Sequence, residues 1–564
     1  MTRAKTFLVL EGGTVQDPAN GIDGCVMDLW MEAGRMVPPP GVLELAGATV
    51  RRIQATGYLV MPGGVDMHSH IAGPKVNLAR RMRPEDKRQT APVKRGLCTR
   101  SGTTGSIPST FATGYLYSGL GYTTAFDAAI APLAARHAYE EFHDTPLIDK
   151  GFFILLGNNH YALTQIARGE NERLRAFAGW ILEAAGAHAI KVVNPGGVEA
   201  WKSGKGNIHS LDELVPNLDC TARQVVRGLA QAAMDLGLPH PMHIHCNNLG
   251  LPGNFRTTLA TMEALEGRSA HFTHVQFHSY GGESHDQSTF CSEAQSLAEW
   301  VNSHPEVTVD VGQVLFGETT SMTGDGPLGY FLHKVTGRRW TSADTELEAG
   351  CGIVPIVYRE KSFVHALQWA IGLEWYLMAK DPWRIAMSTD HPNGGSFLAY
   401  PEIIALLMDR GYRSECLARV HPRVRKRCSL GELDREYTFR EIAIITRAAP
   451  ARILGLTTKG HLGYGADADI TIYQPDTDRR RMFALPRMVI KAGRVVVDDG
   501  EVLGDNAWHP DGSRIWRVKP GFDPGALPDI RKWFENHYTL RFDNYPVDPA
   551  FLAKTEAIAP LRRY

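Results

Sequence analysis

Short apolar runs alternate with amphipathic, helix-length stretches through the middle of the chain. Strands separated by such stretches are typical of parallel β/α units. The runs that qualify as strands are 58–68, 122–126, 151–156, 189–193, 242–245, 270–275, 307–311 and 384–388. Eight parallel strands with intervening helices predict an α/β fold, the (β/α)8 TIM-type barrel, in which chemistry collects at the C-terminal ends of the strands.

The two flanks of this region have a different pattern, in which short β-like runs are separated by turn residues. We expect the flanks to pair with each other and to build one small β-sandwich beside the barrel. The predicted organisation is a first sandwich half at 1–57, a catalytic barrel at 58–450, a second sandwich half at 451–504 and a C-terminal extension at 505–564. A chain of 564 residues exceeds what one core usually supports, which agrees with this division.

Two further segments lie outside the regular pattern of barrel strands and helices. A stretch rich in Gly, Thr and Ser at about 313–364 follows the seventh strand. A loop of this length inside a compact domain is usually a lid or a contact surface. The extension at 505–564 is rich in Trp, Pro and Arg, so we expect it to pack over the core or against a partner.

Composition narrows the class of protein. The chain is 43% hydrophobic and 21% charged, as is ordinary for a soluble globular protein. A net charge of −1 gives no general argument for binding nucleic acid or an acidic membrane. The eight cysteines are scattered without a C-x-x-C motif, and we find neither a membrane-spanning run nor a signal peptide pattern. We therefore expect a cytoplasmic protein with reduced thiols and no iron–sulfur cluster of its own.

The first predicted barrel strand ends in the sequence Met-Pro-Gly-Gly-Val-Asp-Met-His-Ser-His at 61–70. Residues i and i+2 of a strand point to the same side, so His68 and His70 present two imidazoles to one metal ion. An H-x-H pair alone is weak evidence. However, polar residues that could bind a metal also end the predicted strands four, five, six and eight. This coincidence predicts a metal centre in the barrel.

Lys191 interrupts the apolar fourth strand. A buried ammonium is costly, so the side chain either reaches a carboxylate or solvent, or stays neutral. A neutral amine can react with CO2 to form a carbamate, which is an anionic group that can bridge two metal ions. Because Lys191 ends strand four of a barrel that opens with the histidine pair, we favour the carbamate.

Strands five and six each offer more than one histidine. His243 and His245 share a face of strand five, and spacing alone does not choose between them. We prefer His245 as the ligand because it lies nearer the C-terminal end, and His243 is then a packed histidine behind the ligands or an alternative ligand. On strand six we select His274 as the ligand, with His278 as a substrate contact on the following loop and His271 as a structural residue.

Strand eight ends in Asp390, followed by a turn that begins with His391. A lone Asp at a strand end is most often a turn former. In this barrel its carboxylate can bind a metal ion and accept a proton from an attacking water. Asp390 is therefore the predicted catalytic base as well as a ligand.

The combined ligand set resembles the two-zinc site of the amidohydrolase superfamily. Longer strings at 66–77, 191–197, 245–250, 273–282 and 389–394 resemble the A component of formylmethanofuran dehydrogenase and of the bacterial formyltransferase/hydrolase complex. This resemblance covers about residues 5–500. It implies two Zn²⁺ ions bridged by carboxylated Lys191, and zinc-dependent hydrolysis of N-formylmethanofuran to formate and methanofuran, reversible in principle. The ligands would be His68, His70, Lys191, His245, His274 and Asp390.

The resemblance also implies partners and substrate contacts. The partners would be the other subunits of a one-carbon complex. Methanofuran carries a glutamate-rich tail in this family, and a basic segment after strand one could bind those carboxylates, although charge runs are usually solvated surface. The predicted substrate-binding residues are Asn194, Asn247, His278, His391, Arg80, Arg83, Lys87 and Arg88.

Alternative functions stay open at this point. Overall sequence texture favours the formyltransferase/hydrolase complex, with formate release in methylotrophic formaldehyde oxidation. The first alternative is the A component of a formylmethanofuran dehydrogenase, which condenses formate with methanofuran. The others are a cyclic amidase similar to dihydroorotase and an inactive scaffold subunit.

Overall fold

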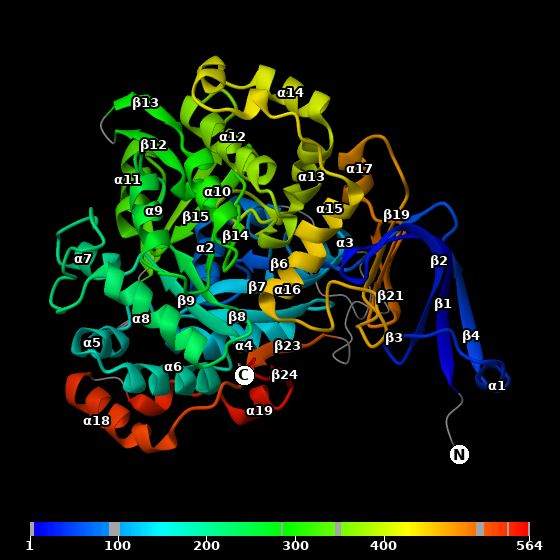
Figure 1. The fold of residues 1–564 in the computed structure, drawn as a ribbon, viewed down its shortest axis with the longest axis horizontal. Helices are drawn as coiled ribbons and strands as arrows, with labels where there is room; N and C mark the ends of the chain where they lie inside the picture. The colour runs from blue at the N-terminus through cyan, green and yellow to red at the C-terminus, as the bar shows by residue number, and fades with distance from the viewer. Residues whose placement is uncertain are drawn as a thin grey trace.

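A parallel barrel forms the centre of the molecule (Figure 1). The structure is a computed structural model, and it describes residues 5–88, 102–283, 286–343, 351–503, 513–538 and 541–561. The barrel strands, in spatial order, are β6 (Gly64–Ser69), β7 (Tyr122–Ile130), β8 (Asp149–Leu155), β9 (Ala189–Val193), β10 (Met242–His245), β11 (Ala270–Phe272), β14 (Val307–Asp310) and β18 (Ile385–Ala386). A parallel bridge between Ser69 and His391 brings the last strand toward the first. The predicted barrel is confirmed.

Helices cover the outside of the barrel between successive strands (Figure 1). Their inner faces and the outer faces of the strands share one apolar core, as expected for parallel strands that are buried on both sides. The principal helices are α3 (Thr110–Gly119), α4 (Ala135–Asp144), α6 (Asn171–Ala185), α8 (Ala222–Asp235), α9 (Phe255–Glu263), α10 (Ala294–Ser303), α12 (Phe363–Met378) and α16 (Ala449–Leu454).

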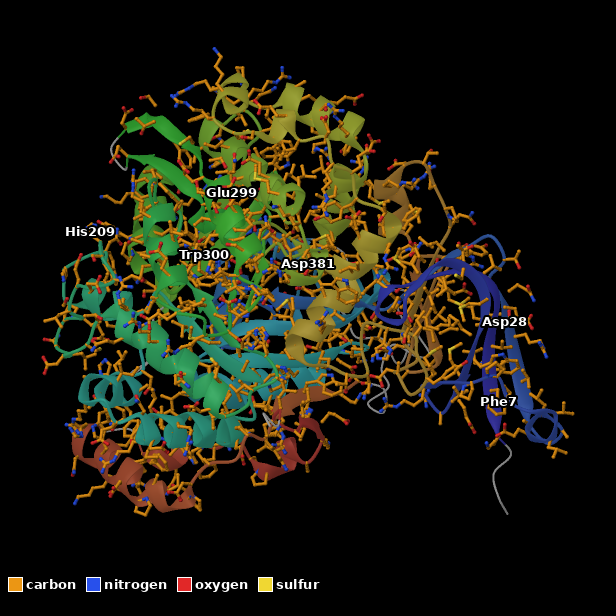
Figure 2. All side chains as sticks on the ribbon, viewed as in Figure 1. Phe7, Asp28, His209, Glu299, Trp300 and Asp381 are labelled. Atoms are coloured by element: carbon orange, nitrogen blue, oxygen red, sulfur yellow. The ribbon has the colours of Figure 1, made fainter. Side chains whose placement is uncertain are left out.

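A nine-stranded sheet lies beside the barrel and takes strands from both flanks of the sequence (Figure 1). Phe7 and Trp30 pack edge to face within it, with ring centroids 6.2 Å apart; Phe7 is labelled in Figure 2. The strands are β1 (Thr6–Asp17), β2 (Ile22–Glu32), β3 (Arg35–Val37), β4 (Thr49–Gln54), β5 (Leu59–Pro62), β19 (Ile470–Tyr473), β20 (Met488–Lys491), β21 (Arg494–Asp498) and β22 (Glu501–Val502). The expected pairing of the two flanks therefore occurs.

The run predicted as a single first barrel strand, 58–68, is two strands. β5 belongs to the nine-stranded sheet and β6 belongs to the barrel. The chain crosses between the sheets at Gly63 and Gly64, where a Cβ atom would overlap the side chains of Thr123 and Tyr122 respectively. The two glycines thus let one apolar run serve two sheets that pack closely together.

The long segment after β14 forms a three-stranded antiparallel sheet with one helix. Its elements are β15 (Gly317–Thr323), α11 (Gly326–Thr336), β16 (Thr341–Ala343) and β17 (Cys351–Tyr358). The C-terminal extension contributes β23 (Ile515–Val518), which pairs in parallel with β8, and β24 (Thr555–Ile558), which pairs with β23. Its helix α18 (Leu527–His537) lies along α6 (Figure 1). Among the described helices, none has the length and apolar character needed to cross a membrane.

Candidate metal centre

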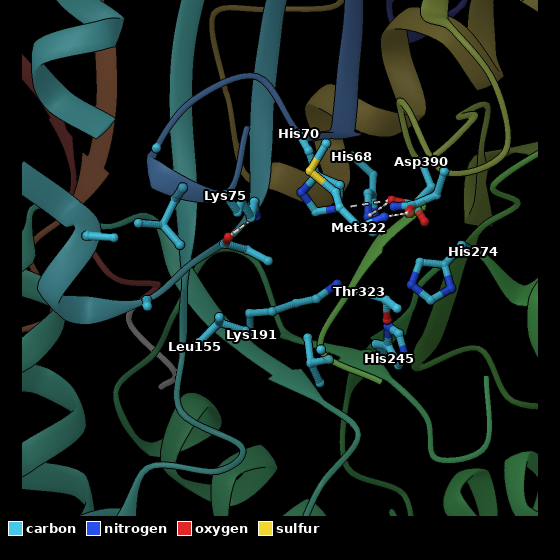
Figure 3. Close-up of a pocket in the computed structure, with 18 of the residues that line it drawn as sticks. His68, His70, Lys75, Leu155, Lys191, His245, His274, Met322, Thr323 and Asp390 are labelled. Atoms are coloured by element: carbon cyan, nitrogen blue, oxygen red, sulfur yellow. Dashed lines mark hydrogen bonds and ion pairs between the residues drawn. The ribbon is translucent and has the colours of Figure 1, made fainter. Parts of the chain in front are cut away.

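One group of candidate ligands joins the first and last barrel strands. His68 lies near the end of β6, His70 follows that strand, and Asp390 follows β18. The Nε2 atoms of His68 and His70 lie 3.0 and 3.1 Å from Oδ1 of Asp390. All three side chains are buried and face one another (Figure 3). Burial alone would raise the pKa of Asp390, but the neighbouring imidazoles hold it well below its usual range, so the carboxylate is ionised.

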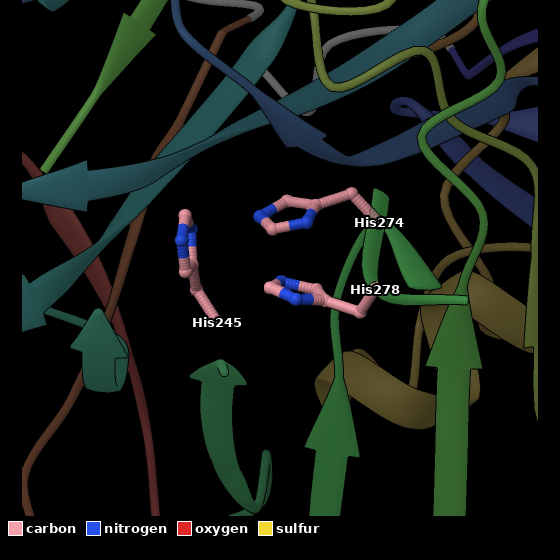
Figure 4. Close-up of side chains that lie close together, drawn as sticks. All are labelled: His245, His274 and His278. Atoms are coloured by element: carbon pink, nitrogen blue, oxygen red, sulfur yellow. The ribbon is translucent and has the colours of Figure 1, made fainter. Parts of the chain in front are cut away.

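A second group of imidazoles lies at the ends of β10 and β11. The rings of His245 and His274 meet edge to face with centroids 4.6 Å apart, and the ring of His278 lies 5.1 Å from that of His245. Figure 4 shows the rings of His274 and His278 side by side, both directed toward His245. Single ligand atoms of these three residues all lie within 4.8 Å of one another.

Lys191 extends from β9 into the space between the two groups (Figure 3). Its side chain is buried, and its Nζ atom has no hydrogen-bond partner among the described residues. Burial lowers the pKa of Lys191 to about 7, which makes the neutral amine available near neutral pH. A single pocket is lined by all six predicted ligands: His68, His70, Lys191, His245, His274 and Asp390.

The donor set fits metal ions. Burial holds the pKa of His245 well below its usual range and lowers that of His274 to about 3, so both rings are neutral. His245 Nε2 and His274 Nδ1 are buried without a hydrogen-bond partner in the described structure. Unpartnered buried nitrogen atoms are costly. Neutral imidazoles beside an ionised carboxylate form the ligand chemistry that zinc prefers.

Two carboxylates that sequence reasoning missed lie behind the histidine pair. Asp310 ends β14, is fully buried, and has Oδ2 3.1 Å from Nδ1 of His68. Burial would raise the pKa of Asp310, but the imidazoles of His68 and His271 hold it well below its usual range. Asp127, on β7, has Oδ1 3.6 Å from Nδ1 of His70. A search for polar residues at the end of strand seven would have found Asp310.

Asp310 accepts hydrogen bonds from several elements at once. Its Oδ2 accepts from the Thr273 hydroxyl at 2.6 Å and lies 3.1 Å from Nε2 of His271. Its Oδ1 accepts from the Ser388 hydroxyl at 2.6 Å and from the backbone N–H of His274 at 3.0 Å. This carboxylate therefore fixes the ends of three barrel strands relative to His68.

None of the predicted substrate contacts whose side chains the structure describes is among the residues that line the pocket. Asn247 donates to Oδ1 of Asn194 at 2.8 Å, which ties together the loops after β10 and β9. The His391 ring packs against Phe397 with centroids 4.8 Å apart. His278 is buried, and both its ring nitrogens lack a hydrogen-bond partner among the described residues.

Two arginines of the basic segment after strand one are paired within the chain. Arg80 donates to Oε1 of Glu141 at 2.6 Å, and buried Arg83 pairs with Asp86 and Glu318. These two guanidinium groups are therefore not free cations. Lys87 is exposed, whereas the side chain of Arg88 lies outside the described residues.

The remaining pocket wall is mostly apolar. It includes Ile130, Leu155 and Met322, and Met322 comes from β15 of the segment after β14. Lys75 adds one cation, whose Nζ lies 3.2 Å from Oδ1 of Asp127. The segment expected to act as a lid or contact surface thus forms part of the pocket.

Comparison with known proteins identifies the family. The model described as "Amidohydrolase family" matches residues 51–497. The chain belongs to the amidohydrolase family. It is 45% identical to Protein FwdA of Methanocaldococcus jannaschii, covering 96% of this chain and 97% of that protein. It is 38% identical to the A component of the formyltransferase/hydrolase complex Fhc of Methylorubrum extorquens, covering 97% of each.

A solved structure agrees with these relatives. The crystal structure of the formyltransferase/hydrolase complex FhcABCD from Methylorubrum extorquens, in complex with methylofuran, contains a similar chain. The match has a TM-score of 0.90 at 36% identity, and covers 98% of this chain and 100% of the other. The resemblance and the fold predicted from the sequence are both confirmed.

Proposed function

We propose that this chain is the amidohydrolase subunit of a cytoplasmic one-carbon complex, and that its pocket hydrolyses the formamide of N-formylmethanofuran or a close analogue. The products are formate and the free amine, and the reaction is reversible in principle. The observation that carries the proposal is the convergence of six donor side chains, from five barrel strands, on one pocket. The similarity to a component of FhcABCD, which was solved with methylofuran, supports the substrate class and the presence of partner subunits.

The chain's own residues would divide the work as follows. His68, His70, His245, His274 and Asp390 would hold two zinc ions, with Lys191 as a carbamate between them. When bound, zinc would lower the pKa of a water ligand and polarise the formamide carbonyl. Ionised Asp390 would accept the proton of the attacking water and deliver it to the departing nitrogen. The apolar wall would exclude bulk water and receive the amine's carrier.

The preferred direction of the reaction is a separate question. Sequence texture favoured the formyltransferase/hydrolase complex, but identity is higher to FwdA, 45% against 38%. The alternative is a formylmethanofuran dehydrogenase component that condenses formate with the amine. The same residues serve both directions, because hydrolysis and condensation share a transition state.

The test compares buried residues of the same kind. Lys191→Ala should lose bound zinc and formate release from N-formylmethanofuran. Lys150→Ala is the matched control, because Lys150 is equally buried and has its pKa lowered to about 7, but donates to the Thr145 carbonyl at 2.8 Å. Asp390→Asn should keep zinc and lower the rate about 10²- to 10⁴-fold. Equal zinc and rates in wild type and Lys191→Ala would refute the bridged site.

A further inference from the structure

Below the ligands, a line of buried histidines runs from helix α16 to the metal site. Nδ1 of His240 lies 2.9 Å from the backbone carbonyl oxygen of Ile453, in the last turn of α16. Nε2 of His240 lies 3.0 Å from Nδ1 of His243, and Nε2 of His243 lies 3.1 Å from Nδ1 of His68. The three imidazoles are buried, with exposed fractions of 0 to 1%.

The carbonyl at the end of this line fixes the direction of every hydrogen bond in it. A carbonyl oxygen only accepts, so Nδ1 of His240 carries the proton and donates to Ile453. In neutral His240, Nε2 is then unprotonated and accepts a hydrogen bond from Nδ1 of His243. In neutral His243, Nε2 is therefore unprotonated as well, and it accepts a hydrogen bond from Nδ1 of His68. In neutral His68 the proton is thereby placed on Nδ1. The lone pair is then on Nε2, the nitrogen that faces Oδ1 of Asp390 at 3.0 Å in the metal site.

The reversed arrangement requires a buried charge. If His240 were doubly protonated, it would donate to His243, which would donate to His68 and leave the proton of His68 on Nε2. The His240 ring stacks on Phe153, with centroids 4.9 Å apart, and the described structure places no carboxylate in contact with it. A cation in these surroundings is costly.

Asp310 leads independently to the same proton position. Its Oδ2 lies 3.1 Å from Nδ1 of His68 and can only accept. The Thr273 hydroxyl, which gives its own proton to Asp310, adds a second acceptor beside the same Nδ1. Three acceptor atoms thus face Nδ1 of His68. Two of them, Oδ2 of Asp310 and Nε2 of His243, lie 3.8 Å from each other.

We propose that Asp310 and the His243–His240 pair are positioning residues, which hold His68 as the Nδ1–H tautomer with its Nε2 lone pair directed at the metal. The carbonyl of Ile453 anchors the pair, so the C-terminus of α16 is coupled to metal binding. Hydrogen-bond partners of this kind orient metal-binding histidines and change metal affinity about 10- to 100-fold when removed. The proposal rests on the metal site of the proposed function, not on its substrate.

The experiment measures zinc affinity of the full chain by competition with a chromophoric chelator. His240→Phe and Asp310→Asn should each weaken one zinc by roughly 10- to 100-fold. His240→Gln can donate to Ile453 and accept from His243, so it should restore affinity. The matched control is His188→Phe, because buried His188 faces the neighbouring Leu454 carbonyl at 2.8 Å and has no contact with His68 in the described structure. This control should bind zinc like wild type.

Two results would overturn the proposal. One is unchanged zinc affinity in folded His240→Phe, and the other is an equal loss in His188→Phe, which would indicate general loosening of the barrel core. If a variant does not fold, a spectroscopic measurement on the metal-free wild-type protein tests the same proposal. Nitrogen-15 spectra of labelled histidine, assigned with His68→Gln, report the tautomer directly, and a proton on Nε2 of His68 would contradict the proposal.

The spectra need a pH well above neutral. A doubly protonated ring has no tautomer, so the spectra must be recorded on the neutral form of His68. The proposed function and this inference fail separately. If His68 carries its proton on Nδ1 but the protein has no formamide activity, only the proposed function is refuted. If the protein is active but every variant binds zinc with the wild-type affinity, only the role of the positioning residues is refuted.

Discussion

A substitution at Gly312 tests whether displacement of His274 impairs metal binding and catalysis. Gly312 follows β14 with φ +65°, and a Cβ atom at this position would lie 2.8 Å from the Cα of His274 and overlap its Cβ. Carbon atoms in contact are ordinarily about 3.5 Å apart. Gly312→Ala therefore forces the two segments apart by about 0.7 Å or more, in addition to a left-handed backbone cost of about 1–2 kcal/mol.

The control separates backbone strain from displacement of the ligand. Gly337 has φ +64°, almost the same as Gly312, but an added Cβ would meet nothing within 4 Å. Gly337→Ala should therefore lose about 1–2 kcal/mol of stability and nothing else. Gly312→Ala should lose at least as much stability and also move a metal ligand, and a displacement near 1 Å can lower the rate about 100-fold.

The assay combines denaturant unfolding, bound zinc and the rate of formate release for both variants. Full zinc and wild-type rates in Gly312→Ala, together with the expected stability loss in both variants, would refute the reasoning. Such a result would mean either that His274 tolerates the shift or that it does not bind the metal. A rate loss in Gly337→Ala would instead show that backbone strain alone explains the effect.

Three other measurements test separate parts of the structure. Burial raises the pKa of Glu374 to about 7. Between pH 4.5 and 7 the unfolded chain therefore loses the Glu374 proton while the folded chain keeps it. The free energy of unfolding should fall by up to about 3 kcal/mol over this range. Glu374→Gln should abolish that fall in denaturant titrations, and an unchanged pH dependence would contradict the assignment. Metal removal by chelation should lower the unfolding temperature, since a ligand that binds only the folded state stabilises it, and zinc should restore it. Phe542 stacks on Trp180 at 4.2 Å and 13°, so Phe542→Ala should cost about 3–5 kcal/mol in denaturant unfolding while leaving KM unchanged.

Strand positions in the barrel could be predicted where the local apolar pattern decides them. The ranges 189–193 and 242–245 match β9 and β10 as the structure has them. The runs 270–275 and 384–388 were too long for a physical reason. His274 takes a left-handed conformation, with φ +36°, which ends β11 early, and the N–H of Met387 bonds to Ile445 instead of continuing the β14 ladder.

Pairings across long stretches of sequence could not be predicted. The sequence-based prediction for Arg80 and Arg83 is substrate binding, with solvated surface as the alternative. Their partners Glu141 and Glu318 are 61 and 235 residues away, so neither pairing is visible in the sequence. The spacing of residues in the sequence also could not decide whether His243 or His245 is the metal ligand. The strand register pairs His243 with Lys191 and with His271, and His243 does not line the pocket. His245, two residues nearer the end of the strand, does line it.

Buried histidines lie among the apolar side chains of the barrel below the metal site, and their presence has a chemical consequence. His240 faces a backbone carbonyl at the end of α16, and His271 faces Asp310. These acceptors cannot donate, so they set the direction of the hydrogen bonds from the bottom of the barrel upward. An apolar core would pack equally well but would leave the ring of His68 free to turn. The buried polar network therefore stabilises one orientation of a ligand. A substitution at His240 should weaken metal binding more than it weakens folding.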